Sequence, residues 1–513
     1  MNKIIVKAGN VTFGGDNPIV VQTMCNTPTQ DIDASFEQCL RLSKAGAQLI
    51  RLTTQGMKEV AALKIIKERL RDAGIETPLS ADVHFTSDVA IAAAEVADKV
   101  RINPGNFARD HETAREQFRR LTEVCSERNC AIRIGVNHGS LGERIIDKYG
   151  DSPLGMKESA LEWINMAQEF NFDQIIVSLK ASNTRVMTDA YRLLYKEFES
   201  MGVAYPLHLG VTEAGNGESG RIKSAVGLAT LLSDGIGDTI RVSLTEDPQK
   251  EIPVASYIAS YFSDRKRNFI IPNIYRKGSD PAVIEASYSE PDWQSFILRA
   301  ACDLGPLMLD NIADDVTLKV TIGGSAAKEE DISRFRDELL QASRRKFTKP
   351  EYIACPGCGR TLFDLETVFE EVKKRTSHLK GYNIAVMGCV VNGPGEMADA
   401  DYGYVGEGRN KVSIYRGKSP VYRSVPQDEA IDKLLSLIEE DARNKVFRPR
   451  LGSLLTYLLF RPFQFPLWLR TTCLQFRFFL MVSSNFLQLL SFQQDGQEIR
   501  QHLRNLCLMK GWY

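Results

Sequence analysis

Hydrophobic and polar positions follow one repeating pattern over residues 1 to about 250. A short apolar run is followed by a polar loop and then by a stretch with helical spacing, such as Ala34 to Ala45 or Lys58 to Ala73. Strands that alternate with helices in this way predict parallel β-α-β units. The eight apolar runs begin at Pro18, Ala47, Pro78, Asp98, Cys130, Gln174, Pro206 and Asp238.

Eight units in about 250 residues match the size of a TIM (β/α)8 barrel. An open doubly wound sheet has the same periodicity, but the count of eight favours the barrel. The predicted fold class is therefore α/β. It consists of an N-terminal TIM barrel over residues 1–250, an inserted subdomain or linker over 251–349, a C-terminal α+β domain over 350–445 and an atypical tail over 446–513.

Polar residues follow most of the predicted strands, at the end where barrel enzymes place their active sites. Five of them are basic: Arg51, Arg101, Arg133, Lys180 and Arg241. Each one taken alone could be a solvated surface charge. Together, at corresponding positions of successive units, they predict a mouth that binds a strongly anionic small molecule, since arginine suits bidentate phosphate contacts.

The three later segments differ in composition. The 251–349 segment is rich in charge and shows no evident chemistry, and its Cys302 is expected to be a buried small apolar residue. In the 350–445 segment strands and helices surround the cysteine turn, which predicts a small α+β domain, and GYVGEG is predicted to be a turn rather than a nucleotide-binding loop. The tail is leucine-rich and aromatic, but arginines and prolines interrupt every window of about 20 residues that could cross a membrane.

Composition narrows the functional classes. The chain has 513 residues, of which 43% are hydrophobic and 25% charged, with a formal net charge of -1, so no overall field indicates a nucleic-acid binder. Ten cysteines are too sparse for a disulfide scaffold. The first residues lack the apolar stretch of a secretory signal. A reducing cytoplasm is expected, where clustered cysteines are more often metal ligands than bridges.

The main chemical signal is Cys355-Pro-Gly-Cys358, followed by Cys389 in the loop C-V-V-N-G-P-G-E. Three thiolates from two chain segments can share one centre, and both iron-sulfur clusters and zinc accept thiolate. A structural zinc site normally closes with a fourth Cys or His. Here Glu396 follows instead, which favours a cluster with one iron held by an exchangeable oxygen. Zinc and a dithiol redox pair stay open.

The chain resembles the GcpE family of 4-hydroxy-3-methylbut-2-enyl diphosphate synthases in the order and spacing of several runs. These are PIVVQTMCNTPTQD, ADVHF, RINPGN, RIGVNHGSL, SLKAS, GVTEAG, GDTIRVSLTEDP, CPGCGRTLFDL and MGCVVNGPGEMADADYGYVG. The middle segment, with LGPLMLDN, resembles the three-domain, insert-bearing form, with a shorter insert. The tail after about residue 445 has no counterpart in the family.

The resemblance implies a reaction and its site. 2-C-methyl-D-erythritol 2,4-cyclodiphosphate is opened and reduced by two electrons, supplied by ferredoxin or flavodoxin through a [4Fe-4S] cluster. Glu213 is then the candidate proton donor, Asn392 lies beside the cluster, and Glu396 is a ligand that gives way. Diphosphate binding falls to Arg51, Arg101, Arg133, Lys180, Arg241 and Ser243, with Asn137 close by.

The barrel and the cysteines are distant in sequence, so the C-terminal domain is expected to close over the barrel, within one chain or across a homodimer. Asp82 and His84 could support the floor of the site or have a structural role only. Two other functions remain. One is a pterin-type transferase barrel with a structural zinc site, and the other is a non-enzymatic iron-sulfur or membrane-associated module.

Overall fold

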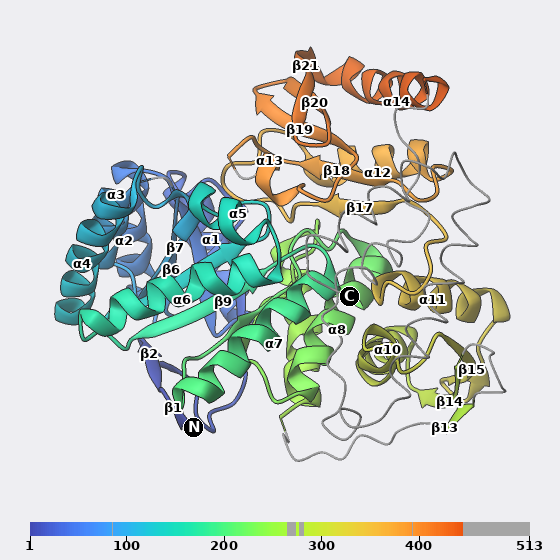
Figure 1. Cartoon of the computed structure of the whole chain (residues 1–513), viewed down its shortest axis with the longest axis horizontal. Helices are drawn as coiled ribbons and strands as arrows, with labels where there is room; N and C mark the ends of the chain where they lie inside the picture. The colour runs from blue at the N-terminus through green and yellow to red at the C-terminus, as the bar shows by residue number, and fades with distance from the viewer. Residues whose placement is uncertain (85, 264–272, 276–281, 392, 445–513) are drawn as a thin grey trace, which may run out of the picture. The chain divides into compact units, whose positions relative to one another are not determined.

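Eight parallel strands form a nearly closed barrel (Figure 1), in the order β11-β12-β4-β5-β6-β7-β8-β9. A bridge between Val177 and Leu207 links the two ends of this sheet. The predicted barrel and all eight predicted strands are confirmed. The strands are β4 (Val20–Met24), β5 (Leu49–Thr54), β6 (Leu79–Val83), β7 (Lys99–Ile102), β8 (Ala131–Asn137), β9 (Ile175–Lys180), β11 (His208–Leu209) and β12 (Thr239–Ile240).

The computed structural model describes residues 1–84, 86–263, 273–275, 282–391 and 393–444, which belong to one compact unit. Two predictions, on Asn392 and on the 446–513 tail, fall outside these described residues. Within the described ranges no helix is long and apolar enough to cross a membrane.

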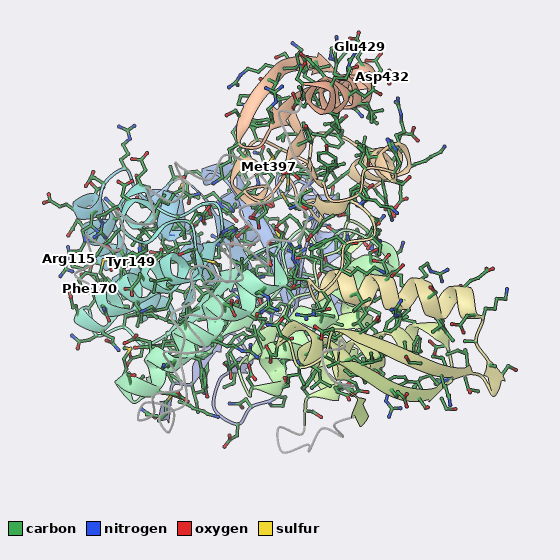
Figure 2. The ribbon with its side chains drawn as sticks, turned by 45° about the vertical axis from the view of Figure 1, so that its right-hand side comes forward. Arg115, Tyr149, Phe170, Met397, Glu429 and Asp432 are labelled. Atoms are coloured by element: carbon green, nitrogen blue, oxygen red, sulfur yellow. The ribbon has the colours of Figure 1, made fainter. Side chains whose placement is uncertain are left out.

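Helices follow the barrel strands and cover their outer faces. They are α1 (Ile32–Lys44), α2 (Met57–Asp72), α3 (Ser87–Ala94), α4 (His111–Arg128), α5 (Glu143–Tyr149), α6 (Pro153–Glu169), α7 (Thr184–Met201) and α8 (Gly217–Ser233). Polar caps begin several of them: the Asp31 side chain accepts a hydrogen bond of 3.1 Å from the Ala34 amide at the start of α1. On the outer surface Arg115 stacks over the Phe170 ring at 5.2 Å (Figure 2).

The amino-terminal end of the barrel is closed by a short hairpin of β2 (Val6–Ala8) and β3 (Val11–Phe13). Val6 and Phe13 are fully buried and pack against Val20, Leu49 and Ile176 of the barrel strands. An edge pair of β1 (Asn2–Lys3) and β10 (Val203–Ala204) lies beside it. The hairpin therefore leaves the carboxyl-terminal end of the barrel available for a site.

Alternation along the strands separates apolar from charged side chains. Val100 and Ile102 of β7 belong to the core between strands and helices, so Lys99 and Arg101 point the other way, into the barrel. The strand register places Asp82, Arg101 and Arg133 side by side on β6, β7 and β8. The register of these three strands thus aligns a carboxylate with two guanidinium groups.

The middle segment is folded and packs on the barrel. It contains α9 (Glu251–Tyr261), β13 (Asn273–Tyr275), β14 (Val283–Glu290), α10 (Trp293–Leu309), β15 (Asp315–Ile322), β16 (Ser325–Ala326) and α11 (Glu329–Ala342), with strand order β13-β14-β15-β16. Helix α10 lies against α8, close enough that a Cβ at Gly305 would be 2.9 Å from Val226 Cγ2. Cys302 is fully buried, as expected.

The C-terminal segment is a mixed five-stranded sheet with helices. The strands, in order, are β17 (Glu351–Ala354), β18 (Asn383–Met387), β19 (Tyr402–Gly408), β20 (Lys411–Arg416) and β21 (Ser419–Pro426), and the helices are α12 (Leu365–Thr376), α13 (Gly393–Glu396) and α14 (Gln427–Arg443). Met397 belongs to a small core of this sheet, and Glu429 and Asp432 are exposed on α14; Figure 2 labels all three.

The predicted turn at GYVGEG is wrong, since these residues lie in the central strand β19. Its neighbours approach too closely for larger side chains. A Cβ at Gly403 would be 2.7 Å from the Met397 sulfur, and one at Gly406 would be 2.5 Å from the Gly388 carbonyl oxygen. The glycines therefore reflect tight packing of a strand, which local turn propensity cannot distinguish.

Candidate active site

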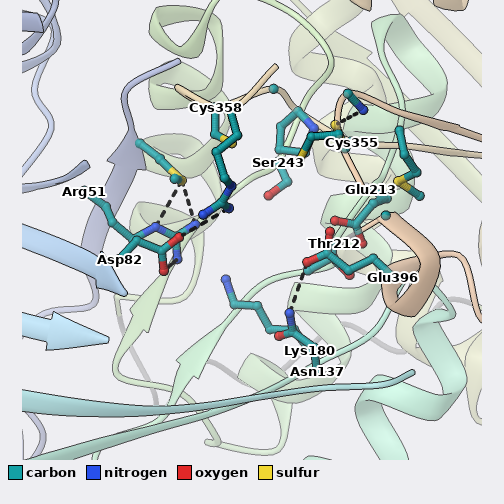
Figure 3. A pocket seen from close by; sticks show the side chains of 18 of the residues that line it. Arg51, Asp82, Asn137, Lys180, Thr212, Glu213, Ser243, Cys355, Cys358 and Glu396 are labelled. Atoms are coloured by element: carbon teal, nitrogen blue, oxygen red, sulfur yellow. Dashed lines mark hydrogen bonds and ion pairs between the residues drawn. The ribbon is translucent and has the colours of Figure 1, made fainter. Parts of the chain in front are cut away.

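One pocket at the carboxyl ends of the barrel strands is lined by both the barrel and the C-terminal segment (Figure 3). Its barrel residues are Met24, Arg51, Asp82, Arg101, Arg133, Asn137, Lys180, Thr212, Glu213, Arg241 and Ser243. The others are Cys355, Pro356, Gly357, Cys358, Arg360, Met387, Gly388, Cys389, Gly393 and Glu396. Every site residue predicted from the sequence lines this pocket except Asn392, which lies outside the described residues; the roles themselves remain predictions.

Asp82 lies at the centre of the cationic side of the pocket. Its Oδ1 is 3.6 Å from Arg101 Nη1, 3.9 Å from Arg133 Nη2 and 4.0 Å from Arg51 Nη1. Burial raises the pKa of Asp82, but the charges of Arg51, His84 and Arg101 outweigh it and hold that pKa well below its usual value. One carboxylate therefore faces several guanidinium groups and cannot neutralise them all.

His84 lies behind Asp82 and contacts both that carboxylate and Arg101. Its Nε2 is 3.3 Å from Asp82 Oδ2 and 2.9 Å from Arg101 Nη1. Burial lowers its pKa to about 4, against the opposing effect of Asp82, so the imidazole is neutral at pH 7. A neutral ring can accept from Arg101 and thereby fix the guanidinium.

The remaining cations are crowded and poorly solvated. Burial, with smaller contributions from neighbouring arginines, lowers the pKa of Arg51 to about 10 and brings those of Arg133 and Lys180 well below their usual values. Nε and Nη1 of Arg133 are buried without a hydrogen-bond partner among the described residues. Such an arrangement favours an anionic ligand. The anion accepts hydrogen bonds from the unpartnered nitrogens and offsets the repulsion between the cations.

Two of the cations are oriented by neighbouring polar side chains. Arg241 donates from Nε and Nη2 to the two oxygens of Glu251, over 3.2 and 3.0 Å. Lys180 Nζ lies 3.2 Å from His208 Nε2, and burial together with Lys180 and Arg133 lowers the pKa of His208 well below its usual value. Arg101 instead passes close to the backbone of Gly135. A Cβ on Gly135 would be 2.4 Å from Arg101 Nε, and Arg101 Nη2 donates to the Gly135 carbonyl oxygen over 3.0 Å.

Glu213 and Glu396 face each other on the opposite side of the pocket (Figure 3). Burial, then the charge of Glu396, raises the pKa of Glu213 well above its usual value, and burial also raises that of Glu396. Asn137 Nδ2 donates to Glu396 Oε1 over 3.1 Å. Two carboxyl groups in contact titrate as a pair, and the raised pKa values mean that the pair favours a shared proton over two negative charges.

Glu213 also has an unusual backbone conformation. Its φ of 50° lies in the left-handed region, where side chains other than glycine are strained. It follows Thr212 in the loop after β11, and it is only 3% exposed. Such strain is retained where the surrounding fold imposes it, often at functional sites.

Three thiols and one carboxylate fit an iron-sulfur cluster as a donor set. Cys355 and Cys358 follow β17, Cys389 follows β18, and the Gly388 amide donates to Cys355 Sγ over 3.3 Å. Burial raises the pKa of Cys355, so a bound cationic centre rather than bulk solvent would displace its proton. Among the described residues no three His, Cys, Asp or Glu side chains are close enough to hold a single metal ion.

The C-terminal segment meets the barrel within one chain. Ala214 and Ala354 form a parallel bridge, and Thr245 Oγ1 donates to the carbonyl oxygens of Ala354 and Cys355 over 3.1 and 3.0 Å. Lys223 on α8 donates to Glu351 Oε1 over 3.0 Å. These contacts place the cysteine loop at the barrel mouth; the predicted closing motion stays a prediction.

Arg360 is a pocket residue that the sequence reasoning missed. It is 8% exposed, and its Nη2 is 4.0 Å from Asp82 Oδ2. Burial lowers its pKa, but the nearby Cys358, Asp82 and Cys389 charges together raise it. The available signal was a basic residue two positions after Cys358, inside the same cysteine loop.

Fold and pocket together define an α/β-barrel protein whose cation-lined mouth is capped by a cysteine-bearing α+β domain. Family comparison agrees with both halves: the GcpE TIM-barrel domain matches residues 3–256, and the GcpE protein C-terminal domain matches residues 351–440. The chain belongs to the GcpE family.

The alignments with curated relatives take in nearly the whole length of each relative. A protein of Phocaeicola vulgatus named 4-hydroxy-3-methylbut-2-en-1-yl diphosphate synthase (flavodoxin) is 37% identical over 596 positions, which take in 85% of this chain and 97% of the relative. Proteins of the same name from Bacteroides thetaiotaomicron and Akkermansia muciniphila are each 36% identical, over 85% of this chain and 97% and 96% of their own. The aligned region is longer than this chain, so the relatives carry internal residues that it lacks.

Solved structures are similar to this chain only distantly. Dihydropteroate synthase from Xanthomonas albilineans, in complex with 7,8-dihydropteroate, is 14% identical with a TM-score of 0.36, over 52% of this chain and 99% of that chain. A sialic acid synthetase from Leptospira borgpetersenii is 11% identical with a TM-score of 0.36, over 51% of this chain and 89% of that chain.

Proposed function

We propose that this chain opens and reduces 2-C-methyl-D-erythritol 2,4-cyclodiphosphate to 4-hydroxy-3-methylbut-2-enyl diphosphate and water. A [4Fe-4S] cluster held by Cys355, Cys358, Cys389 and Glu396 would be the cofactor, and flavodoxin the electron donor. The observation that carries the proposal is the single pocket that combines barrel cations with three cysteines and two carboxyl groups. The names of the relatives support the substrate class and the donor.

The barrel residues would bind and orient the diphosphate. Arg51, Arg101 and Arg133 lie in a row around Asp82, and Lys180 and Arg241 are held by His208 and Glu251. Fixed cations of this kind stabilise charge that develops on a phosphate leaving group without reorganising. Ser243 and Asn137 would supply neutral polar groups to the same pocket.

Glu213, paired with Glu396, would donate the proton that the reaction needs. Release of an oxygen as water needs a proton, and the raised pKa of Glu213 keeps a proton available in a buried position. The cluster, when bound, supplies the one-electron transfers that no side chain here can perform. Contacts between the cysteine loop and the barrel would exclude bulk water from these steps.

A pterin-type transferase with structural zinc is the competing function. It leaves the paired Glu213 and Glu396 without a task, and the names of the curated relatives give it no support. Metal content separates the two directly, because a zinc protein is colourless and contains no sulfide.

The decisive experiment is anaerobic purification of the full chain, followed by iron, sulfide and zinc analysis and by turnover with the cyclic diphosphate and reduced flavodoxin. About four irons and four sulfides per chain, with turnover, are expected. Stoichiometric zinc without sulfide, or an iron-loaded protein that leaves the cyclic diphosphate unchanged, would contradict the proposal.

A further inference from the structure

Arg360 enters the barrel mouth from the C-terminal segment, which makes it different from every other cation of the pocket. The other cationic residues that line it, Arg51, Arg101, Arg133, Lys180 and Arg241, all belong to the barrel. Arg360 follows the cysteine loop after β17. Its guanidinium reaches Asp82, the carboxylate that Arg51, Arg101 and Arg133 already share.

Arg360 has more hydrogen-bond donors than acceptors around it. Nε and Nη1 are buried and have no hydrogen-bond partner among the described residues, and Nη2 is 4.0 Å from Asp82 Oδ2, beyond hydrogen-bond distance. Arg133 on the barrel side has the same two nitrogens unpartnered. Both guanidinium groups line the pocket, one from each segment. Buried donors of this kind call for an acceptor, and a phosphate offers several oxygens to both.

The backbone beside Arg360 is fixed against the barrel. A Cβ on Gly359 would be 2.7 Å from the Thr27 carbonyl oxygen and 3.1 Å from Pro28 Cα, in the loop that follows β4. The cysteine loop can therefore approach this closely only with glycine at that position. The approach sets how far Arg360 extends toward Asp82.

We propose that Arg360 is a phosphate-binding residue of the pocket, and that it makes anion binding depend on contact between the C-terminal segment and the barrel. This inference rests on the proposed diphosphate substrate. An anion held by barrel arginines and by Arg360 at once bridges the two segments, so binding strengthens their contact and their contact strengthens binding. Arg360 also lies near Cys358 and Cys389, so a role limited to the thiolates is the competing explanation.

Inorganic pyrophosphate is the probe, titrated calorimetrically into the anaerobically purified full chain at fixed ionic strength. Arg360→Ala should weaken binding about 10- to 100-fold, as expected for loss of a charge-assisted contact. Arg360→Lys keeps the charge but loses the planar fork, and should weaken binding by a smaller factor. Gly359→Ala keeps the guanidinium but displaces it, and should weaken binding as well.

Lys418→Ala is the matched control. Lys418 lies 3.2 Å from Asp151 in another ion pair between the C-terminal segment and the barrel, but it is 52% exposed and lies outside the pocket. Its loss should leave the dissociation constant of pyrophosphate unchanged. If Arg360→Ala lowers the stability of the fold too far for titration, the test uses Arg360→Lys and Gly359→Ala instead.

Each result has one meaning. Unchanged pyrophosphate affinity in the Arg360 variants, with or without loss of iron, overturns the inference and assigns the residue to the thiolates or to packing. Equal weakening in Lys418→Ala also overturns it, because general contact between the segments would then be enough. If the unaltered chain does not bind pyrophosphate at all, the proposed function itself is contradicted, which is a separate outcome.

Discussion

The two sides of the pocket carry opposite kinds of charge: cations crowd the barrel side, and carboxyl groups and thiols gather on the other. On the barrel side, cations crowd around the single carboxylate of Asp82, and burial lowers the pKa of Arg51, Arg133 and Lys180. On the other side, the buried Glu213 lies with the half-buried Glu396 and three half-buried thiols, and desolvation raises the pKa of Glu213 and Cys355. The charge distribution of one side therefore suits an anion, and that of the other side suits a cationic centre and a proton, as the proposed function requires.

Replacing Cys389 with serine tests the thiol side most severely. A hydroxyl is a poor substitute for thiolate at iron, so iron content and activity should be lost together, with turnover down at least about 1000-fold. Pyrophosphate affinity should change little, since the barrel cations remain. Iron analysis, turnover and titration measure the three quantities, with Cys302→Ala as the control cysteine. Retention of both iron and activity would remove Cys389 from the ligand set.

Replacing Glu213 with glutamine removes the buried proton but keeps the shape. Turnover should fall about 100-fold or more, within the usual range for a general acid, while iron content and substrate affinity stay near those of the unaltered chain. Steady-state kinetics and iron analysis on the same preparation separate these effects. Glu143→Gln, on the exposed surface of α5, is the control. A variant with normal turnover would show that Glu213 is not the proton donor.

Anion binding should draw a proton onto the barrel side. Burial, then Arg133, Arg51 and other cations, keeps the pKa of Lys180 well below its usual value, and an anion favours the charged amine and raises that pKa. Pyrophosphate binding near pH 8 should therefore be accompanied by net proton uptake. Calorimetry in buffers of different ionisation enthalpy measures this uptake, and Lys180→Met should reduce it. Equal uptake in both proteins would exclude Lys180 as its source.

The smallest effect concerns the junction between barrel and C-terminal segment. Glu351 pairs with Lys223 and Arg344; burial raises its pKa, but these cations outweigh burial and lower it to about 2. A carboxylate with a lowered pKa stabilises the fold above its unfolded pKa of about 4.3, and this contribution is lost as the pH falls toward 2. Glu351→Gln should lower the free energy of unfolding by about 2 kcal/mol at pH 7.

Thermal unfolding at several pH values checks this prediction. The difference in Tm between the unaltered chain and Glu351→Gln should shrink as the pH falls from 5 to 3. Glu366→Gln, at an exposed position of α12, should behave like the unaltered chain at every pH. A difference that is constant with pH would mean that packing, and not charge, is responsible.

Much of the barrel could be predicted because strand and helix periodicity are local properties. The five cations at strand ends were found in the same way, since parallel strands share one carboxyl edge. The strand β19 was missed because its glycines look like turn residues until Met397 and Gly388 are seen to pack on them. Arg360 was missed because only the contact between the cysteine loop and the barrel brings it to Asp82.

By itself the sequence determined which end of the barrel most of the predicted site residues occupy, because alternation along a strand and spacing between cysteines follow from covalent connectivity. The tertiary structure decided which of them meet. Asp82 and Arg360 are far apart in the sequence, and Asn137 and Glu396 are 259 positions apart, yet each pair shares the pocket. Contacts of this range depend on how segments pack, and packing is a property of the whole fold that no local pattern contains.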